Sequence, residues 1–188
     1  MCGITAISAN KEALPFLLQG LEKLEYRGYD SAGITTIEGN HLFTKKAKGR
    51  LQNLKDLLKD ENVLGHVGIG HTRWATHGIP SNLNSHPHTN NDETISLVHN
   101  GIIENYRELK EILILQGYQF HSETDSEVAA ALLNHYYKGD PKEAIKKTVS
   151  KLKGTFALVI LFEDQPDVIY SIRNVSPIVA TICKEGAM

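Results

Sequence analysis

Residues 66–78 read HVGIGHTRWATHG, and the change of character within this stretch is the clearest guide to how the chain folds. Val67 and Ile69 alternate with glycines, which is typical of a β-strand, and the run then gives way to small and polar residues. Residues 93–101, ETISLVHNG, show the same change from an apolar run to a polar end. Two strands that end in polar clusters predict two loops at one rim of a sheet.

The elements on either side of this stretch come in pairs. Before it, the apolar spacing predicts a strand over residues 2–9, a helix over 11–28, a hairpin over 32–49 and a helix over 51–60. After it, the spacing predicts helices over 105–120, 124–137 and 140–152, and a hairpin formed by 154–164 and 167–174. Strand pairs that alternate with helix pairs predict antiparallel sheets with helices packed outside them, an α+β layered fold.

Capping residues predict where these helices begin, and the spacing of apolar residues predicts which face of each helix is buried. Asn10 is available to cap the first helix, Thr124 and Glu127 form a capping box, and Asp140 precedes a proline at the first helical position. The leucines of the helix over 51–60 are predicted to share one face: Leu51, Leu54, Leu57 and Leu58. In the helix over 105–120 the same is expected of Leu109, Ile112 and Leu113.

Composition narrows the class of protein. At 188 residues the chain is long enough for one well-buried core, and 20 Lys and Arg against 22 Asp and Glu give a net charge of −2. We therefore expect no nucleic-acid or membrane partner, and a small neutral or zwitterionic ligand instead. Two cysteines, Cys2 and Cys183, do not make a disulfide framework, which together with the lack of a leader predicts a cytoplasmic protein.

Cys2 stands directly behind the start methionine. Removal of Met1 would give it both a thiol and a free α-amino group. A thiol is inert while protonated, and an α-amine with a pKa of about 7.7 to 8 is a suitable base within reach of it. The alternative is a cysteine that only fills space in a core, which is the usual role of a buried cysteine.

The histidines and the polar strand ends are the other candidates for chemistry. His86 and His88, or His71 and His77, suggest a metal site, but neither pair has acidic or cysteine partners at ligand spacing, so we expect no metal. A Cys–His dyad is a further alternative. Arg73 is a bidentate donor for a carboxylate, and the Asn100 amide with the Gly101 N–H is suited to an oxyanion hole. Both clusters are also compatible with simple tight turns.

Seven segments, in order, carry a resemblance to a known family: CGI at 2–4, LEYRGYDSAGI at 24–34, GHTRWATHG at 70–78, HPH at 86–88, VHNGIIENY at 98–106, SETDSEV at 122–128 and GTFAL at 154–158. The chain resembles the glutaminase domain of the glutamine:fructose-6-phosphate amidotransferases, which belong to the N-terminal-nucleophile class. The resemblance weakens after about Asp164, and residues 175–188 have no assigned role.

The resemblance implies a four-layer αββα sandwich and a set of site residues. It implies that Cys2 is the nucleophile and that its own α-amine is the base, with Asn100 and Gly101 as the oxyanion hole. Its implied substrate-binding residues for L-glutamine are Arg73, Thr76, His77, Asp125, Arg27 and Gly28. Trp74, the one tryptophan, would be a gate for ammonia; the alternative is ordinary core packing. No cofactor is implied.

The resemblance also sets the expected extent of the domain. Residues 2–188 are expected to form one type-2 glutamine amidotransferase domain that stops before the family's usual end. The sugar-isomerase domains, which would bind fructose 6-phosphate and be the partner of this domain, are expected to be absent. The predicted activity is hydrolysis of glutamine to glutamate and ammonia, and a homodimer is left open. The competing hypothesis is a catalytically silent module that binds glutamine or regulates the enzyme.

Overall fold

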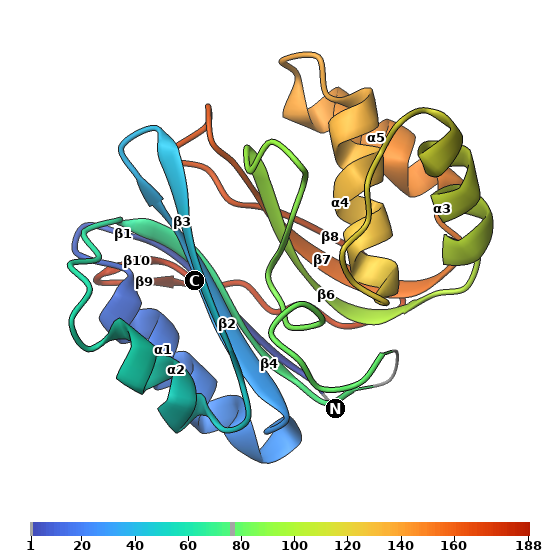
Figure 1. Ribbon diagram of the computed structural model, residues 1–188. Helices are drawn as coiled ribbons and strands as arrows, with labels where there is room; N and C mark the ends of the chain where they lie inside the picture. The colour runs from blue at the N-terminus through green and yellow to red at the C-terminus, as the bar shows by residue number, and fades with distance from the viewer. Residues whose placement is uncertain (1, 76–77) are drawn as a thin grey trace.

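Two antiparallel β-sheets face each other in the computed structural model, which describes residues 2–75 and 78–188, and helices cover the outer side of each sheet (Figure 1). The order of layers is therefore helix, sheet, sheet, helix. This arrangement confirms the predicted α+β class and the four-layer αββα sandwich.

The first sheet, sheet A, is built mainly from the N-terminal part of the chain, and its last two strands, at one edge, come from the C-terminal end. Its strands are β1 (Gly3–Ala9), β2 (Ser31–Glu38), β3 (His41–Lys48), β4 (Val67–Arg73), β9 (Ile182–Cys183) and β10 (Gly186–Ala187). They pair in the order β3-β2-β4-β1-β10-β9. The helices on its outer face are α1 (Leu14–Leu24) and α2 (Leu51–Leu58), and a 3₁₀ turn, η1 (Glu25–Arg27), follows α1.

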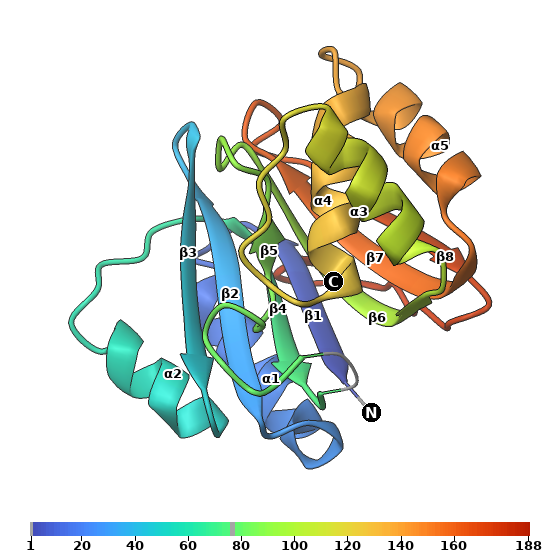
Figure 2. The same cartoon turned by 45° about the vertical axis from the view of Figure 1, so that its right-hand side comes forward.

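The second sheet, sheet B, is built from the middle and later part of the chain. Its strands are β5 (His88–Thr89), β6 (Ile95–Ile103), β7 (Gly154–Phe162) and β8 (Tyr170–Asn174), paired in that order. The helices on its outer face are α3 (Tyr106–Leu115), α4 (Asp125–Tyr136) and α5 (Pro141–Lys151). Figure 2 shows them stacked against β6 and β7, with α4 next to the sheet.

Three apolar clusters hold the four layers together. One joins α1 and α2 to sheet A through residues such as Leu17, Leu21 and Leu54, and another joins the other helices to sheet B. The third lies between the sheets and consists of Ile37, Val67, Ile69, Val98, Val159 and Leu161. Face-to-face sheet packing of this kind keeps the strands of both layers in a fixed relation, and this fixes the geometry of any site built on them.

The two strands that carry the polar clusters do not lie in one sheet. β4 pairs with β1 and β2 in sheet A, whereas β6 pairs with β5 and β7 in sheet B. His99, Asn100 and Gly101 also lie within β6, paired with Leu158, Ala157 and Phe156, so they form no tight turn. The prediction of two loops at one rim is wrong, because polar residues inside paired strands face each other across the two sheets.

The helix details are partly confirmed. Thr124 and Asp140 accept the N–H of Glu127 and Glu143, as helix caps do. Asn10 does not cap α1, whose N-cap residue is Ala13, because α1 begins later than predicted. Leu57 and Ile112 are about half exposed, at 51% and 47%, because α2 and α3 each bury a narrower stripe than the leucine spacing suggested.

The C-terminal segment completes sheet A. β9 and β10 form a small hairpin, and β10 pairs with β1 through Ser8↔Ala187 and Ala9↔Gly186. The unassigned residues 175–188 therefore run from the end of sheet B to the edge of β1. Within the described part of the chain, none of the helices has the length and apolar character of a membrane span.

Candidate functional site

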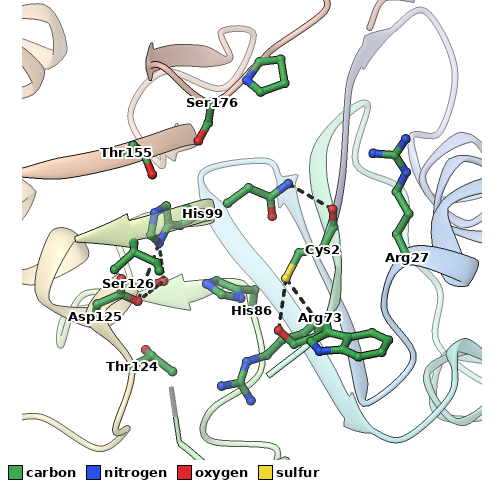
Figure 3. A pocket seen from close by; sticks show the side chains of 15 residues that line it. Cys2, Arg27, Arg73, His86, His99, Thr124, Asp125, Ser126, Thr155 and Ser176 are labelled. Atoms are coloured by element: carbon green, nitrogen blue, oxygen red, sulfur yellow. Dashed lines mark hydrogen bonds and ion pairs between the residues drawn. The ribbon is translucent and has the colours of Figure 1, made fainter. Parts of the chain in front are cut away.

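A cavity of about 500 Å³ opens between the two sheets where β1 begins and β4 ends (Figure 3). This volume is typical of a small-molecule site. Its lining comes from both sheets and from α4: Cys2, Arg27, Arg73, Trp74, His86, His99, Asn100, Gly101, Ile102, Thr124, Asp125, Ser126, Thr155, Ser176 and Pro177. Eight of the predicted site residues are described by the structure, and five of these are polar or charged side chains that meet here: Cys2, Asn100, Arg73, Asp125 and Arg27.

Cys2 lies at the start of β1 beside the end of β4, because Gly3 pairs with Thr72. Its Sγ accepts a hydrogen bond from the backbone N–H of Trp74 at 3.2 Å. Burial raises the pKa of the Cys2 thiol above its ordinary value, and the negative charge of Asp30 raises this pKa further. The hydrogen bond from the Trp74 N–H and the positive charge of Arg73 lower the pKa, but they do not cancel the effect of burial. The thiol is therefore protonated at neutral pH and needs a base before it can act as a nucleophile.

Asn100 and Gly101 lie on β6 directly opposite the nucleophile strand. The Asn100 Nδ2 donates to the Cys2 carbonyl at 3.3 Å, so the side-chain amide and the cysteine are in direct contact. Gly101 has φ +129°, and a Cβ there would come within 2.0 Å of the Thr155 carbonyl oxygen. Only glycine fits this backbone, and Gly101 therefore lines the cavity without a side chain.

Arg73 and Asp125 give the cavity one group of each charge. Arg73 is the last residue of β4, only 3% exposed, and donates from Nη2 to the Gly78 carbonyl at 3.3 Å. Asp125 is the first residue of α4, where the helix dipole favours a carboxylate. Its Oδ2 accepts from the Ile103 N–H at 2.8 Å and its Oδ1 from the Ser126 hydroxyl at 3.3 Å, so the carboxylate is held in one orientation.

Arg27 and Trp74 line the side of the cavity nearest η1, whereas Gly28, the residue after η1, is not part of the lining. Figure 3 shows Arg27 on the side of Cys2 away from Asp125, and its Nε donates to the Tyr26 hydroxyl at 2.8 Å. Gly28 lies against β4, where a Cβ would meet the Arg73 carbonyl carbon at 2.7 Å, so it sets the approach of η1 to β4. Trp74 is 47% exposed and packs edge-on against Tyr29, which rules out the core-packing alternative.

Two of the predicted substrate-binding residues, Thr76 and His77, lie outside the described residues. Their roles remain predictions.

Three histidines near the site, His71, His86 and His88, are buried and neutral. Burial lowers the pKa of His71 to about 3, and it lowers the pKa of His86 and of His88 well below the ordinary value. Such weakly basic imidazoles are poor bases for a thiol proton. Within residues 2–75 and 78–188, no group of three or more His, Cys, Asp or Glu side chains is arranged to hold a metal ion.

Sequence reasoning missed several residues of this cavity. Ser126 lies beside Asp125 and hydrogen bonds to His99 Nδ1 at 2.9 Å, and Thr155 and Ser176 close the wall formed by sheet B. The one signal in the sequence that pointed to Ser126 was its position directly after Asp125 at the start of a helix. Thr155 and Ser176 are brought to the cavity only by the pairing of β7 with β6 and β8, which the local sequence does not encode.

Comparison with known proteins agrees with this geometry. A sequence profile described as a glutamine amidotransferase domain matches residues 71–180. The chain is 52% identical over 185 residues to the glutamine–fructose-6-phosphate aminotransferase [isomerizing] of Clostridium tetani, covering 98% of this chain and 30% of that protein. It is 47% identical over 190 residues to the enzyme of the same name from Thermococcus kodakarensis, covering 100% of this chain and 31% of that protein. The chain thus spans less than a third of the length of these relatives.

Solved structures give the same result for the fold. The glutamine phosphoribosylpyrophosphate amidotransferase from B. subtilis, complexed with ADP and GMP, superposes with a TM-score of 0.75 at 33% identity, covering 86% of this chain and 35% of that one. A second structure, described as the allosteric regulatory enzyme of purine biosynthesis, gives a TM-score of 0.77 at 33% identity, covering 86% of this chain and 36% of that one.

Proposed function

The chain belongs to the glutamine amidotransferase family, and from that premise we propose that it hydrolyses the side-chain amide of L-glutamine through a thioester on Cys2. One observation carries the proposal. The Asn100 amide donates to the Cys2 backbone carbonyl at 3.3 Å beside a cavity that Cys2, Arg73 and Asp125 all line. A nucleophile, an oxyanion donor and a pair of opposite charges are what the hydrolysis of an amino acid amide requires.

The first step is attack by the Cys2 sulfur on the amide carbon. Removal of Met1 leaves Cys2 with a free α-amine, which takes the thiol proton directly or through a water. This base is needed because burial raises the pKa of the thiol. The new S–C bond converts the carbonyl oxygen into an oxyanion, which the Asn100 Nδ2 and the Gly101 N–H stabilise. Loss of one such donor typically costs about 100- to 1000-fold in rate.

Collapse of this intermediate breaks the C–N bond, and the proton held by the α-amine passes to the leaving nitrogen, so ammonia and a γ-glutamyl thioester form. Water then attacks the thioester carbon with the α-amine again as base. Glutamate leaves and the thiol is restored. The stoichiometry is one glutamine and one water to one glutamate and one ammonia, with no change of oxidation state.

Substrate recognition follows from the two charges. Arg73 binds the α-carboxylate through its guanidinium fork, and Asp125 accepts the α-ammonium. The resemblance alone assigns Thr76 and His77 to substrate binding, and it assigns Arg27 and Gly28 to orienting the terminal amine of Cys2. Trp74 is the gate through which ammonia leaves. The other roles rest on the resemblance together with the lining of the cavity.

The relatives extend the proposal beyond the chain itself. The matched aminotransferases are named for glutamine and fructose 6-phosphate, and this chain spans about 30% of their length. We assign residues 2–188 as the glutaminase domain of such an enzyme in the cytoplasm, with sugar-isomerase domains as the partner that accepts the ammonia. Fructose 6-phosphate should then neither bind the 188-residue chain in calorimetric titration nor change its rate of glutamate release. Saturable binding of fructose 6-phosphate to this chain would contradict the assignment of the sugar site to other domains.

The direct test is glutamate release from glutamine by the wild-type chain and by Cys2→Ala. We expect no release by Cys2→Ala, because no other group in the cavity forms the thioester. Cys183→Ala is the matched control, since Cys183 is also a free thiol but lies exposed on β9, and it should retain full activity. Equal rates for the wild type and Cys2→Ala would favour the silent glutamine-binding module instead.

A further inference from the structure

His71 lies beneath the cavity and belongs to none of the roles assigned above. It is fully buried in the middle of β4, where it pairs with Ile4 on one side and Gly33 on the other. Its ring packs on that of His86 with centroids 4.2 Å apart. The side chain therefore has a fixed position in the rigid centre of sheet A and reaches across to sheet B.

The contacts of His71 determine which ring nitrogen carries the proton. Nε2 lies 3.1 Å from the His99 carbonyl oxygen and 3.0 Å from the Asn100 Oδ1, and both of these atoms accept hydrogen bonds. Nδ1 has no hydrogen-bond partner among the described residues. A proton on Nδ1 would leave a buried donor unsatisfied and turn the Nε2 lone pair toward two oxygens. The neutral Nε2–H tautomer is thus the one that fits.

The same bond decides which way the Asn100 amide faces. With Oδ1 held by His71 Nε2–H, the NH₂ group is left to face the Cys2 carbonyl at 3.3 Å and the cavity. If the amide were turned by 180°, its NH₂ would face the His71 N–H and its oxygen would face the Cys2 carbonyl oxygen. Both contacts would then be repulsive.

We propose that His71 is a positioning residue that holds the Asn100 amide with its N–H groups toward the reacting carbonyl. The proposal rests on the proposed function, because it concerns the oxyanion donor of that reaction. His71 touches neither substrate nor nucleophile in this assignment. Without its N–H, the amide rotates between two orientations, of which only one stabilises the oxyanion.

Kinetics of His71→Leu and His71→Gln test this role. Leucine removes the donor, and we expect kcat to fall about 10- to 100-fold, less than full loss of an oxyanion donor because the amide still visits the right orientation. KM for glutamine and the affinity for glutamate should change less than about threefold, since ground-state binding does not use the donor. Glutamine places an N–H near the position of Nε2, so His71→Gln should recover most of kcat.

A double-mutant cycle with Asn100→Ala separates positioning from general damage. If His71 acts through Asn100, then His71→Leu should have little further effect on kcat in the Asn100→Ala background. An equal loss in both backgrounds, or a kcat for His71→Leu at the wild-type level, would overturn the proposal. His88→Leu is the matched control for loss of a buried histidine, because His88 Nε2 contacts Thr124 and not Asn100. It should lose stability but keep kcat in the folded fraction.

A measurement on the unaltered chain keeps the proposal testable if His71→Leu fails to fold. Nitrogen-15 NMR of the imidazoles should show His71 as the neutral Nε2–H tautomer from pH 8 down to about pH 5, since burial lowers its pKa to about 3. An Nδ1–H tautomer or an imidazolium in this range would overturn the proposal. Activity of Cys2→Ala equal to that of the wild type would instead remove the proposed function, whatever the tautomer of His71.

Discussion

The gap between the two sheets is apolar at one end and polar at the other, and the same strands build both ends. Along β4, Val67 and Ile69 belong to the inter-sheet cluster, and the next two residues on that face are His71 and Arg73. Along β6, Val98 packs in the cluster and Asn100 follows it on the same face. One continuous strand face therefore packs the two sheets together at one end and carries the candidate site at the other.

This division predicts that changes at the polar end alter turnover and leave stability largely intact, while changes at the apolar end do the reverse. The apolar and polar ends are only two residues apart on each strand, so a substitution at one end must leave its near neighbours undisturbed for this prediction to hold.

The largest effect should follow from blocking the α-amine of Cys2. A chain that retains Met1 or carries an acetyl group lacks the proposed base, and loss of a general base typically costs about 100- to 10,000-fold. The unfolding midpoint should not change, because the inter-sheet cluster is untouched. Glutamate release from the free and the blocked chain, with urea unfolding of both, checks this. Full activity of the blocked chain would favour a Cys–His dyad, to be sought at His77 and His99.

Replacement of Arg73 should have the next largest effect. Arg73→Ala leaves the substrate carboxylate in a cavity without its counter-charge, and such losses cost about 2 to 5 kcal/mol, so kcat/KM should fall by about 30- to 5000-fold. Arg73→Lys should also be impaired, because an ammonium does not reproduce the guanidinium fork. The exposed Arg50→Ala is the control for lost charge. Wild-type kcat/KM for Arg73→Ala would show that another group binds the carboxylate.

The apolar end is tested by Ile69→Ala. Ile69 is fully buried between the sheets, so truncation should lower the free energy of unfolding by about 2 to 5 kcal/mol. Turnover per folded molecule should stay within about twofold of the wild type. Ile182→Ala, at an 87% exposed position, is the matched control and should be nearly neutral. A large fall in kcat for the folded Ile69→Ala protein would show that packing and chemistry are not separable along β4.

The polar end should make the fold sensitive to acid. In the folded state burial holds the pKa of His71 at about 3, well below the value of about 6.5 expected when the chain unfolds. The unfolded chain therefore binds more protons between these values, and stability falls as the pH drops from about 6.5 toward 3. At pH 5 the loss from His71 alone is about 2 kcal/mol, and His86 and His88 act in the same direction. Urea unfolding at pH 7 and pH 5 measures it; equal stability at both would contradict neutral burial.

Sequence patterns predicted the layers well because each layer depends on local periodicity. The apolar spacing in Leu17 and Leu21, and the caps at Thr124 and Asp140, carry their own signal within a few residues. What the patterns did not predict was the meeting of β4 and β6 from opposite sheets, since the polar residues at 99–101 look like a turn when read alone.

The residues of the candidate site likewise differ in whether the sequence alone could predict them. Cys2, Arg73 and Asn100 were predicted from the chemistry of their side chains and from the resemblance, and Asp125 from the resemblance alone; the structure places all four around one cavity. His71 was considered only as a metal ligand or one of a histidine pair. Its contact with Asn100 depends on the register of β4 and on how one sheet lies over the other, and neither is a property of a short segment.

The smallest predicted effect concerns the link between the two sheets, where the chain leaves β8 and passes the cavity. Val175 has φ +69°, and the Ser176 N–H donates to the Asn174 carbonyl at 2.8 Å, so these three residues form a γ-turn of the strained kind. A β-branched residue pays about 1 to 2 kcal/mol for a positive φ, and Val175 is 73% exposed, so little packing offsets that strain. Val175→Gly removes it but makes the unfolded chain more flexible, at a cost of about 0.4 to 1 kcal/mol. We expect the free energy of unfolding, measured with urea, to rise by about 0.5 to 1 kcal/mol.

Val179→Gly is the matched control. Val179 is 90% exposed and is not among the residues with positive φ, so this variant carries the flexibility cost alone and should be slightly destabilising. If both variants lost the same amount of stability, the turn would hold no strain, and Ser176 would reach the cavity wall without any conformational cost.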